Sequence, residues 1–151
     1  MFRGYVPRSI DPKGRLLLPP GIKDEILRQS SEGKIILTNF DQCVVAYPWP
    51  EWEKIEQSFA NLNMANKLFR DFQRFFLSGA TEVVLDKQGR ILIPPYLREY
   101  AGLHKEVILA GVGRKFEIWD LQRFEKARKG MEENFDQIMD ELAEHGFELR
   151  F

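Results

Sequence analysis

One nine-residue segment occurs twice in this chain, and the repeat constrains the fold more strongly than any other feature. Residues 11–19 read DPKGRLLLP and residues 86–94 read DKQGRILIP, so both copies keep an acid, a glycine, an arginine, an apolar triplet and a proline. Self-similarity at a fixed period is typical of repeat architectures, in which each copy forms one structural unit. We therefore expect two similar units in one polypeptide.

Each copy has the pattern of a tight turn that leads into a short buried strand. An Asp side chain can accept hydrogen bonds from the backbone amides that follow it, and glycine tolerates a positive φ. The apolar triplet is typical of a strand, which the following prolines end. We expect strands at 4–10 and 15–18 joined by a turn at 11–14, so that Arg15 lies at the tip of a hairpin, and the same arrangement around Arg90.

The motif arginine can have one of two roles. Its guanidinium can pair with the Asp four residues earlier, Asp11 for Arg15 and Asp86 for Arg90, and then serve the turn alone. It can instead project outward to phosphate or guanine, since the guanidinium fork matches both. One copy alone would favour the structural role, because short motifs often match by chance. The second copy shifts the balance toward a function.

The duplication extends past the motif to a whole β-β-α-β-β unit. The pattern predicts a helix and two strands after each motif, at 22–27, 34–38 and 43–47 in the first copy and at 95–101, 106–110 and 115–119 in the second. Equivalent residues of the two copies are 75 positions apart up to the helix and 72 positions apart after it. Such a unit has too little core to be stable alone. The predicted fold class is therefore α+β, with two tandem repeats forming one pseudo-twofold β-barrel-like body.

Helical segments are expected to follow both repeats. Apolar residues recur at helical spacing from Trp52 onward and again over 65–77, and one amphipathic helix is expected over 124–142. We expect the first repeat with its C-terminal helix at 1–62, a connecting helix at 63–77, and the second repeat with an acidic C-terminal helix at 78–151.

Length and cysteine content are those of an ordinary globular protein. A chain of 151 residues can bury a sizeable core without disulfides. The single cysteine, Cys43, lies in an apolar run and is expected in a buried strand, with no second cysteine for a disulfide or a metal site. The N-terminal segment lacks the apolar core of a signal peptide, and no apolar run reaches the length of a membrane span. We expect a cytoplasmic protein without a metal or other cofactor.

Charge is distributed unevenly along the chain. The net charge is −1, but residues 132–148 contain seven Asp or Glu and no Lys or Arg, which leaves a net charge of +6 on the remaining sequence. A basic body joined to an acidic segment is a hint of nucleic-acid contact through one face, although a solvated acidic helix beside an ordinary domain gives the same distribution.

The two Asp-x-x-Gly-Arg-x-x-x-Pro motifs, the Arg3-Gly4 start and the duplicated plan make the chain similar to the MraZ family of bacterial transcriptional regulators. The resemblance covers nearly the whole chain. It implies AbrB-like swapped-hairpin units and a ring-shaped homo-oligomer. It also implies a cytoplasmic, nucleoid-associated protein that binds short direct repeats of double-stranded DNA in its own promoter and regulates the division and cell wall gene cluster.

The same resemblance implies roles for individual residues. It assigns Asp11, Gly14, Asp86 and Gly89 to shaping the turns. It assigns DNA contact to the motif arginines, Arg15 and Arg90. The basic residues around the motifs add further DNA-binding candidates: Lys13, Arg8, Arg3 and Lys87. We expect Lys13, Arg8 and Arg3 to contact phosphates and Arg15 to contact guanine in the major groove.

The two motifs differ in the charge around them. Residues 3–15 have a net charge of +3, whereas the aligned residues 78–90 have a net charge of zero. Because phosphate contacts dominate DNA affinity, the first motif should bind more strongly, so Arg15 is favoured over Arg90. Arg90 could contact DNA, a neighbouring subunit or its own turn.

Two other classes of function compete with DNA binding. An enzyme is disfavoured, because His104 and His145 have no His or Cys at metal-ligand spacing and no nucleophile motif is present. An oligomeric protein-interaction module without specific DNA binding is the stronger alternative, because the net charge is near zero and the helical segments are rich in aromatic residues.

Overall fold

A computed structural model describes residues 1–150 and contains both copies of the β-β-α-β-β unit. The first copy consists of β1 (Tyr5–Ser9), β2 (Arg15–Leu17), α1 (Pro20–Gln29), β3 (Lys34–Phe40) and β4 (Cys43–Pro48). The second consists of β5 (Thr81–Val84), β6 (Arg90–Leu92), α4 (Pro95–Ala101), β7 (Glu106–Gly111) and β8 (Phe116–Asp120). The predicted tandem duplication is thereby confirmed.

The pairing of the strands differs from the predicted local hairpins. We expected 4–10 to pair with 15–18, but those segments share only the bridge between Ile10 and Leu16. Strand β1 instead pairs with β7, and β5 pairs with β3. The remaining two strands, β2 and β6, pair with each other. Each repeat therefore exchanges its first two strands with the other repeat.

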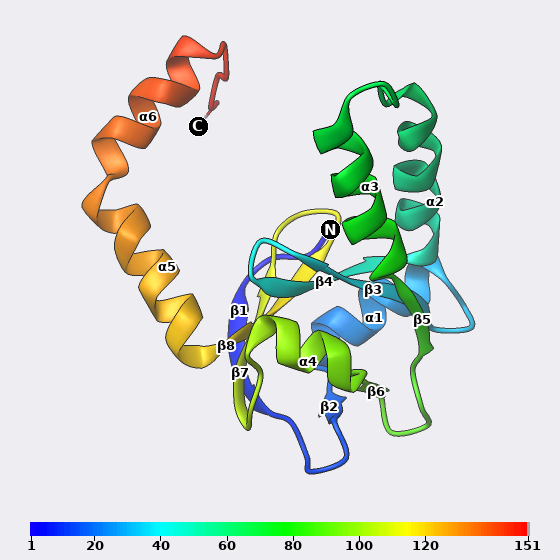
Figure 1. The fold of residues 1–151 in the computed structure, drawn as a ribbon. Helices are drawn as coiled ribbons and strands as arrows, with labels where there is room; N and C mark the ends of the chain where they lie inside the picture. Colours follow the sequence, from blue (N-terminus) through cyan, green and yellow to red (C-terminus); the bar gives the residue numbers. More distant parts are fainter. Residues whose placement is uncertain (151) are drawn as a thin grey trace. The chain divides into compact units, whose positions relative to one another are not determined.

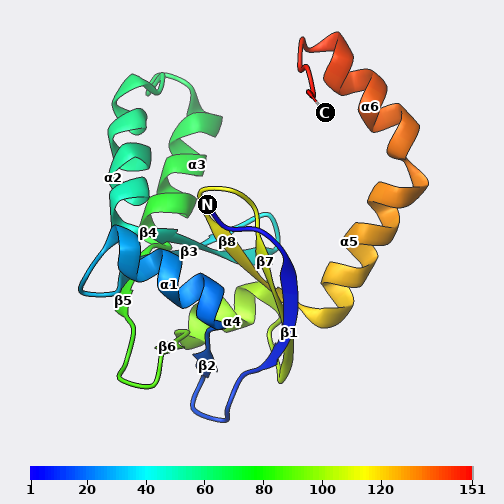
Figure 2. The same ribbon diagram turned by 180° about the vertical axis from the view of Figure 1, so that it is seen from behind.

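The exchange produces a pseudo-twofold arrangement (Figures 1 and 2). One sheet has the order β1-β7-β8-β4-β3-β5. If this order is read from the other end and each strand is replaced by its equivalent in the other repeat, the same order results. The second sheet is the β2-β6 ladder. Val6 pairs with Leu109, and Thr81, 75 positions after Val6, pairs with Leu37. Leu37 lies 72 positions before Leu109, so the predicted change in spacing from 75 to 72 is confirmed. Within the described residues, neither sheet closes into a barrel.

The main core lies between the six-stranded sheet and the layer formed by α1, α4 and the ladder. Leu16 and Ile91 face each other at the centre of the ladder and are both buried. Around them the core collects apolar side chains from both repeats, including Ile26, Leu97 and Phe116. Because both copies contribute to it, neither repeat could bury its apolar residues alone.

The opposite face of the sheet is covered by the helices between the repeats, α2 (Trp49–Ser58) and α3 (Lys67–Ser78), with the short 3-10 turn η1 (Phe59–Asn61). Trp52 stacks on Phe76 with ring centroids 5.5 Å apart, and both rings pack over Ile36 of β3. The Thr38 hydroxyl donates to the Phe76 carbonyl at 2.7 Å, which joins the end of α3 to the sheet. Cys43 is fully buried in β4, as expected.

The chain divides into two compact units, residues 1–120 and a helical unit that begins at Leu121. The helical unit contains α5 (Leu121–Glu133) and α6 (Phe135–Glu144), so the single helix expected over 124–142 is wrong. Asn134 separates the two helices, and its side-chain amide donates to the Gly130 carbonyl at 2.9 Å. An Asn side chain competes for backbone groups in this way and favours a helix boundary. Among the described residues, no helix is both long and apolar enough to cross a membrane.

Candidate nucleic-acid interface

The two motif loops fold in the same way around their aspartates. In the first loop, Asp11 Oδ1 accepts the backbone N–H groups of Lys13 and Arg15 at 2.9 Å, and Asp11 Oδ2 accepts the Arg15 Nε–H at 2.6 Å. In the second loop, Asp86 binds the corresponding groups of Gln88 and Arg90 at 2.8 to 2.9 Å. The pairing of each arginine with its own Asp, one of the two roles that the sequence leaves open, is therefore present.

These hydrogen bonds stabilise the charged form of both carboxylates. The backbone N–H of Arg15 lowers the pKa of Asp11 below its ordinary value, and the Arg15 side chain and the Lys13 amide lower it further. The backbone N–H of Arg90 has the same effect on the pKa of Asp86. Because the folded pKa is lowered, the stabilisation of each turn is present above the ordinary Asp pKa of about 4 and is lost as the pH falls through the lowered value.

A titration can test this assignment. In carboxyl ¹³C NMR, we expect Asp11 and Asp86 to titrate below the ordinary Asp range. Replacing Arg15→Ala should raise the pKa of Asp11 only part of the way, because the backbone N–H of residue 15 remains as the largest cause. Asp86 is the internal control and should not move. An Asp11 carboxyl that titrates normally in the unsubstituted protein would show that the turn opens in solution.

The ladder places both motif arginines on one face. Arg15 lies opposite Leu92, and Leu17 lies opposite Arg90. Since successive side chains of a strand point to opposite faces, these four residues share the face that is turned away from the buried Leu16. Diagonal neighbours in such a pair are roughly 7–8 Å apart, so the two guanidinium groups belong to one surface rather than to two separate hairpin tips.

The exposure of this face is suited to contact with a partner. The Arg15 and Arg90 side chains are 36% and 30% exposed, and Leu17 and Leu92 are about half exposed. In each arginine the Nε–H binds the carboxylate, while the four N–H groups of Nη1 and Nη2 lie at the other end of the guanidinium; in Arg90, Nη2 also donates to Gln88 Oε1 at 3.3 Å. The Asp therefore orients the arginine, and the structural and functional roles are compatible.

Each motif glycine is covered by a basic residue of the other repeat. A Cβ atom placed on Gly14, which has φ +87°, would lie 2.9 Å from the Arg98 guanidinium carbon, and one on Gly89, with φ +79°, would lie 3.1 Å from the Lys23 stem. The Gly14 carbonyl accepts the Ile93 N–H at 2.9 Å, so the loop is also held by the backbone of the other copy. Lys23 and Arg98 could not be predicted from the sequence, because only the strand exchange brings them to the loops.

A hollow of about 630 Å³ lies beside the first loop. Asp11 and Pro12 form one side of it, and Arg98, His104 and Lys105 contribute the basic or titratable groups of the lining. At the equivalent positions of the first repeat, Lys23 replaces Arg98 but Glu32 and Gly33 replace His104 and Lys105. The surroundings of the first loop are therefore more basic than those of the second, in agreement with the difference in sequence charge.

The other predicted DNA-binding residues lie at different distances from the ladder. Lys13 and Lys87 lie in the two motif loops, which emerge together at the bottom of Figure 1. Arg8 lies on β1, and one of its Nη groups donates to the Pro7 carbonyl at 2.9 Å. Arg3 lies before β1, beside Gly111 at the last residue of β7, whereas Ser9 at the other end of β1 pairs with Glu106 at the first residue of β7. The structure therefore groups Lys13, Arg15, Lys87 and Arg90, and leaves Arg3 apart from them.

Metal-binding groups do not gather at this site or elsewhere in residues 1–150, where no cluster of three His, Cys, Asp or Glu side chains could hold a metal ion. His104 is exposed at the rim of the basic hollow, and the N–H of Ile10 pairs with the carbonyl of the adjacent Lys105 at 2.8 Å. The geometry is thus that of a surface with several cations and two exposed leucines.

Known proteins resemble the chain over most or all of its length. A family model described as "MraZ protein, putative antitoxin-like" matches it twice, over residues 1–75 and 76–146. A protein of Solidesulfovibrio magneticus named Transcriptional regulator MraZ is 57% identical over 152 residues, covering 100% of both chains. Proteins of the same name are 45% identical in Nitratidesulfovibrio vulgaris, covering 100% of this chain and 99% of the relative, and 44% identical in Coxiella burnetii, covering 85% and 86%.

Proposed function

The chain belongs to the MraZ family, and we propose on this premise that it is a transcriptional regulator that binds double-stranded DNA through the β2-β6 ladder and its two loops. The observation that carries the proposal is the placement of Arg15 and Arg90 on one exposed face, each held by its own Asp. The names of the relatives support regulation of transcription as the role of this binding.

Base recognition is assigned to the arginines. With Nε bound to the aspartate, Nη1 and Nη2 can donate to guanine O6 and N7, which is the commonest specific contact in the major groove. A two-stranded ribbon such as β2-β6 is narrow enough to enter that groove. Leu17 and Leu92 lie between the two arginines on the same face and can make apolar contact with a thymine methyl group.

Phosphate contacts are assigned to the cations around the ladder. Lys13 and Lys87 lie in the loops, and Lys23, Arg98 and Lys105 lie beside them. Such contacts fix the position of the ribbon on the duplex and supply most of the affinity through counterion release. Since the first loop has the more basic surroundings, we assign it the larger share of the affinity, and Arg15 remains favoured over Arg90.

One ladder contacts few base pairs, so useful affinity requires several subunits. In a homo-oligomeric ring, the first contact makes the later ones effectively intramolecular, and the overall affinity rises without new contacts. We propose that the ring binds short direct repeats in the promoter of its own operon and thereby regulates the division and cell wall gene cluster. A nucleoid-associated location in the cytoplasm follows from this role.

Salt dependence tests the proposal. We expect the protein to shift a duplex from the promoter of its own gene, and to bind a scrambled duplex of equal length more weakly. Each phosphate contact gives a slope of about −0.9 in log K against log salt, so the five cations assigned above predict a loss of roughly 500-fold between 50 and 200 mM salt. Equal affinity for both duplexes, or affinity that does not change with salt, would contradict the proposal.

The alternative is an oligomeric protein-interaction module. It is favoured by the exposed aromatic side chains of α3, where Phe69, Phe72 and Phe75 are each about 40% exposed. An apolar interface of this kind should keep its affinity as salt rises, because it depends on burial of apolar surface rather than on ion release. The same titration therefore separates the two functions.

A further inference from the structure

The two repeats differ where each helix begins. Tyr96 is the second residue of α4, and its hydroxyl donates to the carbonyl of Gly79, at the start of the same repeat, at 2.9 Å. The equivalent position in the first repeat, 75 residues earlier, is Gly21, the second residue of α1. A Cβ atom built on Gly21 would meet no atom within 4 Å. The first repeat therefore lacks the aromatic ring and has open space in its place.

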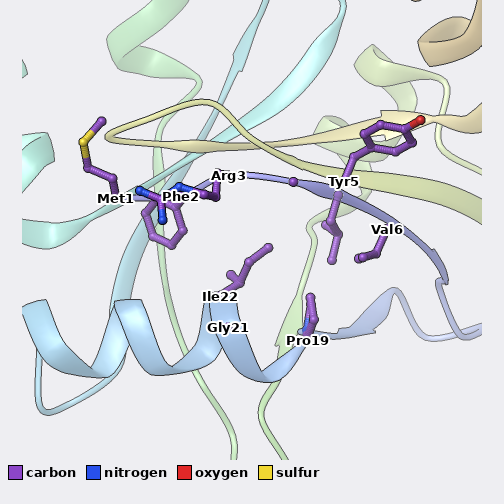
Figure 3. A pocket seen from close by; sticks show the side chains of 10 residues that line it. Met1, Phe2, Arg3, Tyr5, Val6, Pro19, Gly21 and Ile22 are labelled. Atoms are coloured by element: carbon purple, nitrogen blue, oxygen red, sulfur yellow. The ribbon is translucent and has the colours of Figure 1, made fainter. Parts of the chain in front are cut away.

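That space is part of a cavity of about 460 Å³ between α1 and the segment that leads into β1. Figure 3 shows Pro19, Gly21 and Ile22 on the helix side and Phe2, Arg3 and Val6 on the opposite side. No side chain rises from Gly21 between these two walls. A volume of this order lies in the range of small-molecule sites, which are mostly apolar with a few polar groups.

Five residues that line the cavity have counterparts of similar character at the equivalent positions of the other repeat. Phe2, Gly4, Pro19, Ile22 and Leu109 correspond to Leu77, Gly79, Pro94, Leu97 and Leu37. These five positions keep the apolar or glycine character of the wall, whereas Arg3, Tyr5 and Val6 of the lining correspond to Ser78, Ala80 and Thr81. Gly4 corresponds to the residue whose carbonyl accepts the Tyr96 hydroxyl; its own carbonyl accepts the Gly111 N–H at 2.8 Å and has a second lone pair.

We propose that this cavity is a binding site for a small molecule with a phenol ring, which would lie where the second repeat places Tyr96. The ring would pack between Phe2, Ile22 and Leu109, and its hydroxyl would donate to the Gly4 carbonyl. Tyr96 itself is 47% exposed, so a ligand in the equivalent place keeps one side in water. A fragment as small as 4-methylphenol should then bind with a dissociation constant of roughly 1 mM.

The pseudo-symmetry provides a direct test with the full-length protein and 4-methylphenol, the side-chain analogue of tyrosine. In ¹H–¹⁵N NMR titrations, we expect one saturable site per chain that shifts the amides of Gly4, Gly21 and Ile22. Gly21→Tyr should fill the cavity and weaken binding at least tenfold. Gly21→Ala, which adds no ring, should leave binding within about twofold. Tyr96→Gly should leave an equivalent cavity in the second repeat and give two binding sites for 4-methylphenol per chain.

Two results would overturn the proposal. If Tyr96→Gly binds 4-methylphenol in the new cavity of the second repeat while the unsubstituted chain binds none, the cavity of the first repeat does not accept a phenol ring. If Gly21→Tyr binds as tightly as the unsubstituted chain, the ligand lies elsewhere. DNA affinity of Gly21→Tyr should stay within about twofold, because Gly21 is not in the ladder or the motif loops, so this test is independent of the proposed function.

Discussion

Arg15→Ala should abolish specific binding to the promoter duplex while the fold and the oligomer mass stay unchanged. A bidentate contact between arginine and guanine contributes about 1–3 kcal/mol, and the loss recurs in every subunit that engages a repeat. We therefore expect affinity to fall by at least about 100-fold. Arg90→Ala should also weaken binding, because Arg90 lies on the same face, but by a smaller factor. Gel-shift titration at constant salt measures both effects.

Arg114→Ala is the matched control for charge. It removes one cation from the turn after β7, at the opposite end of that strand from the motif loops, and Arg114 is 70% exposed. Its affinity should stay within about threefold of the unsubstituted protein. If Arg15→Ala changed the far-UV circular dichroism or the oligomer mass, Arg15 would be a structural residue. If it bound DNA normally with the fold intact, the ladder would not be the recognition surface.

Leu16→Ala should destabilise the protein by about 2–5 kcal/mol, because it leaves a cavity at the centre of the ladder. Leu16 is fully buried and lies opposite Ile91, where the two repeats meet. Urea unfolding at fixed protein concentration measures the change in the free energy of unfolding, and the fixed concentration is needed because assembly shifts apparent stability.

Leu17→Ala is the matched control, since it makes the same change one residue later on the opposite face. Leu17 is 50% exposed, and its loss should alter the free energy of unfolding by no more than about 0.5 kcal/mol. We expect it to weaken DNA binding instead, because Leu17 lies between the arginines. Equal destabilisation by both variants would mean that the ladder does not present the two faces described.

Local patterns were enough to locate most elements. The alternation of apolar residues and the turn residues around Asp11 and Asp86 depend on interactions within a few positions, so strands, turns and the change in repeat register could be predicted. The break at Asn134 could not, because the apolar spacing of the C-terminal segment continues across both helices. A single Asn within such a pattern carries too weak a signal to end a helix.

Only the part of the candidate site that depends on residues close together in the sequence could be predicted. The pairing of Arg15 with Asp11 follows from a spacing of four residues, and the structure has it. Arg98 and Lys23 were missed because each approaches a loop that lies far away in the sequence. Contacts of this kind are set by the packing of the two repeats and leave no local pattern.

The sequence by itself determined the duplication, the order of the elements and the identity of the motif arginines, since these depend on residue types at short spacing. Residue patterns alone did not decide which strands pair; the tertiary structure has the exchange that the resemblance to swapped-hairpin units implies. Strands of equivalent repeats have the same apolar pattern, so a partner within the repeat and one in the other repeat are equally compatible with the sequence. The structure contains the exchanged pairing, which buries Leu16 against Ile91 and places Arg15 and Arg90 on one surface.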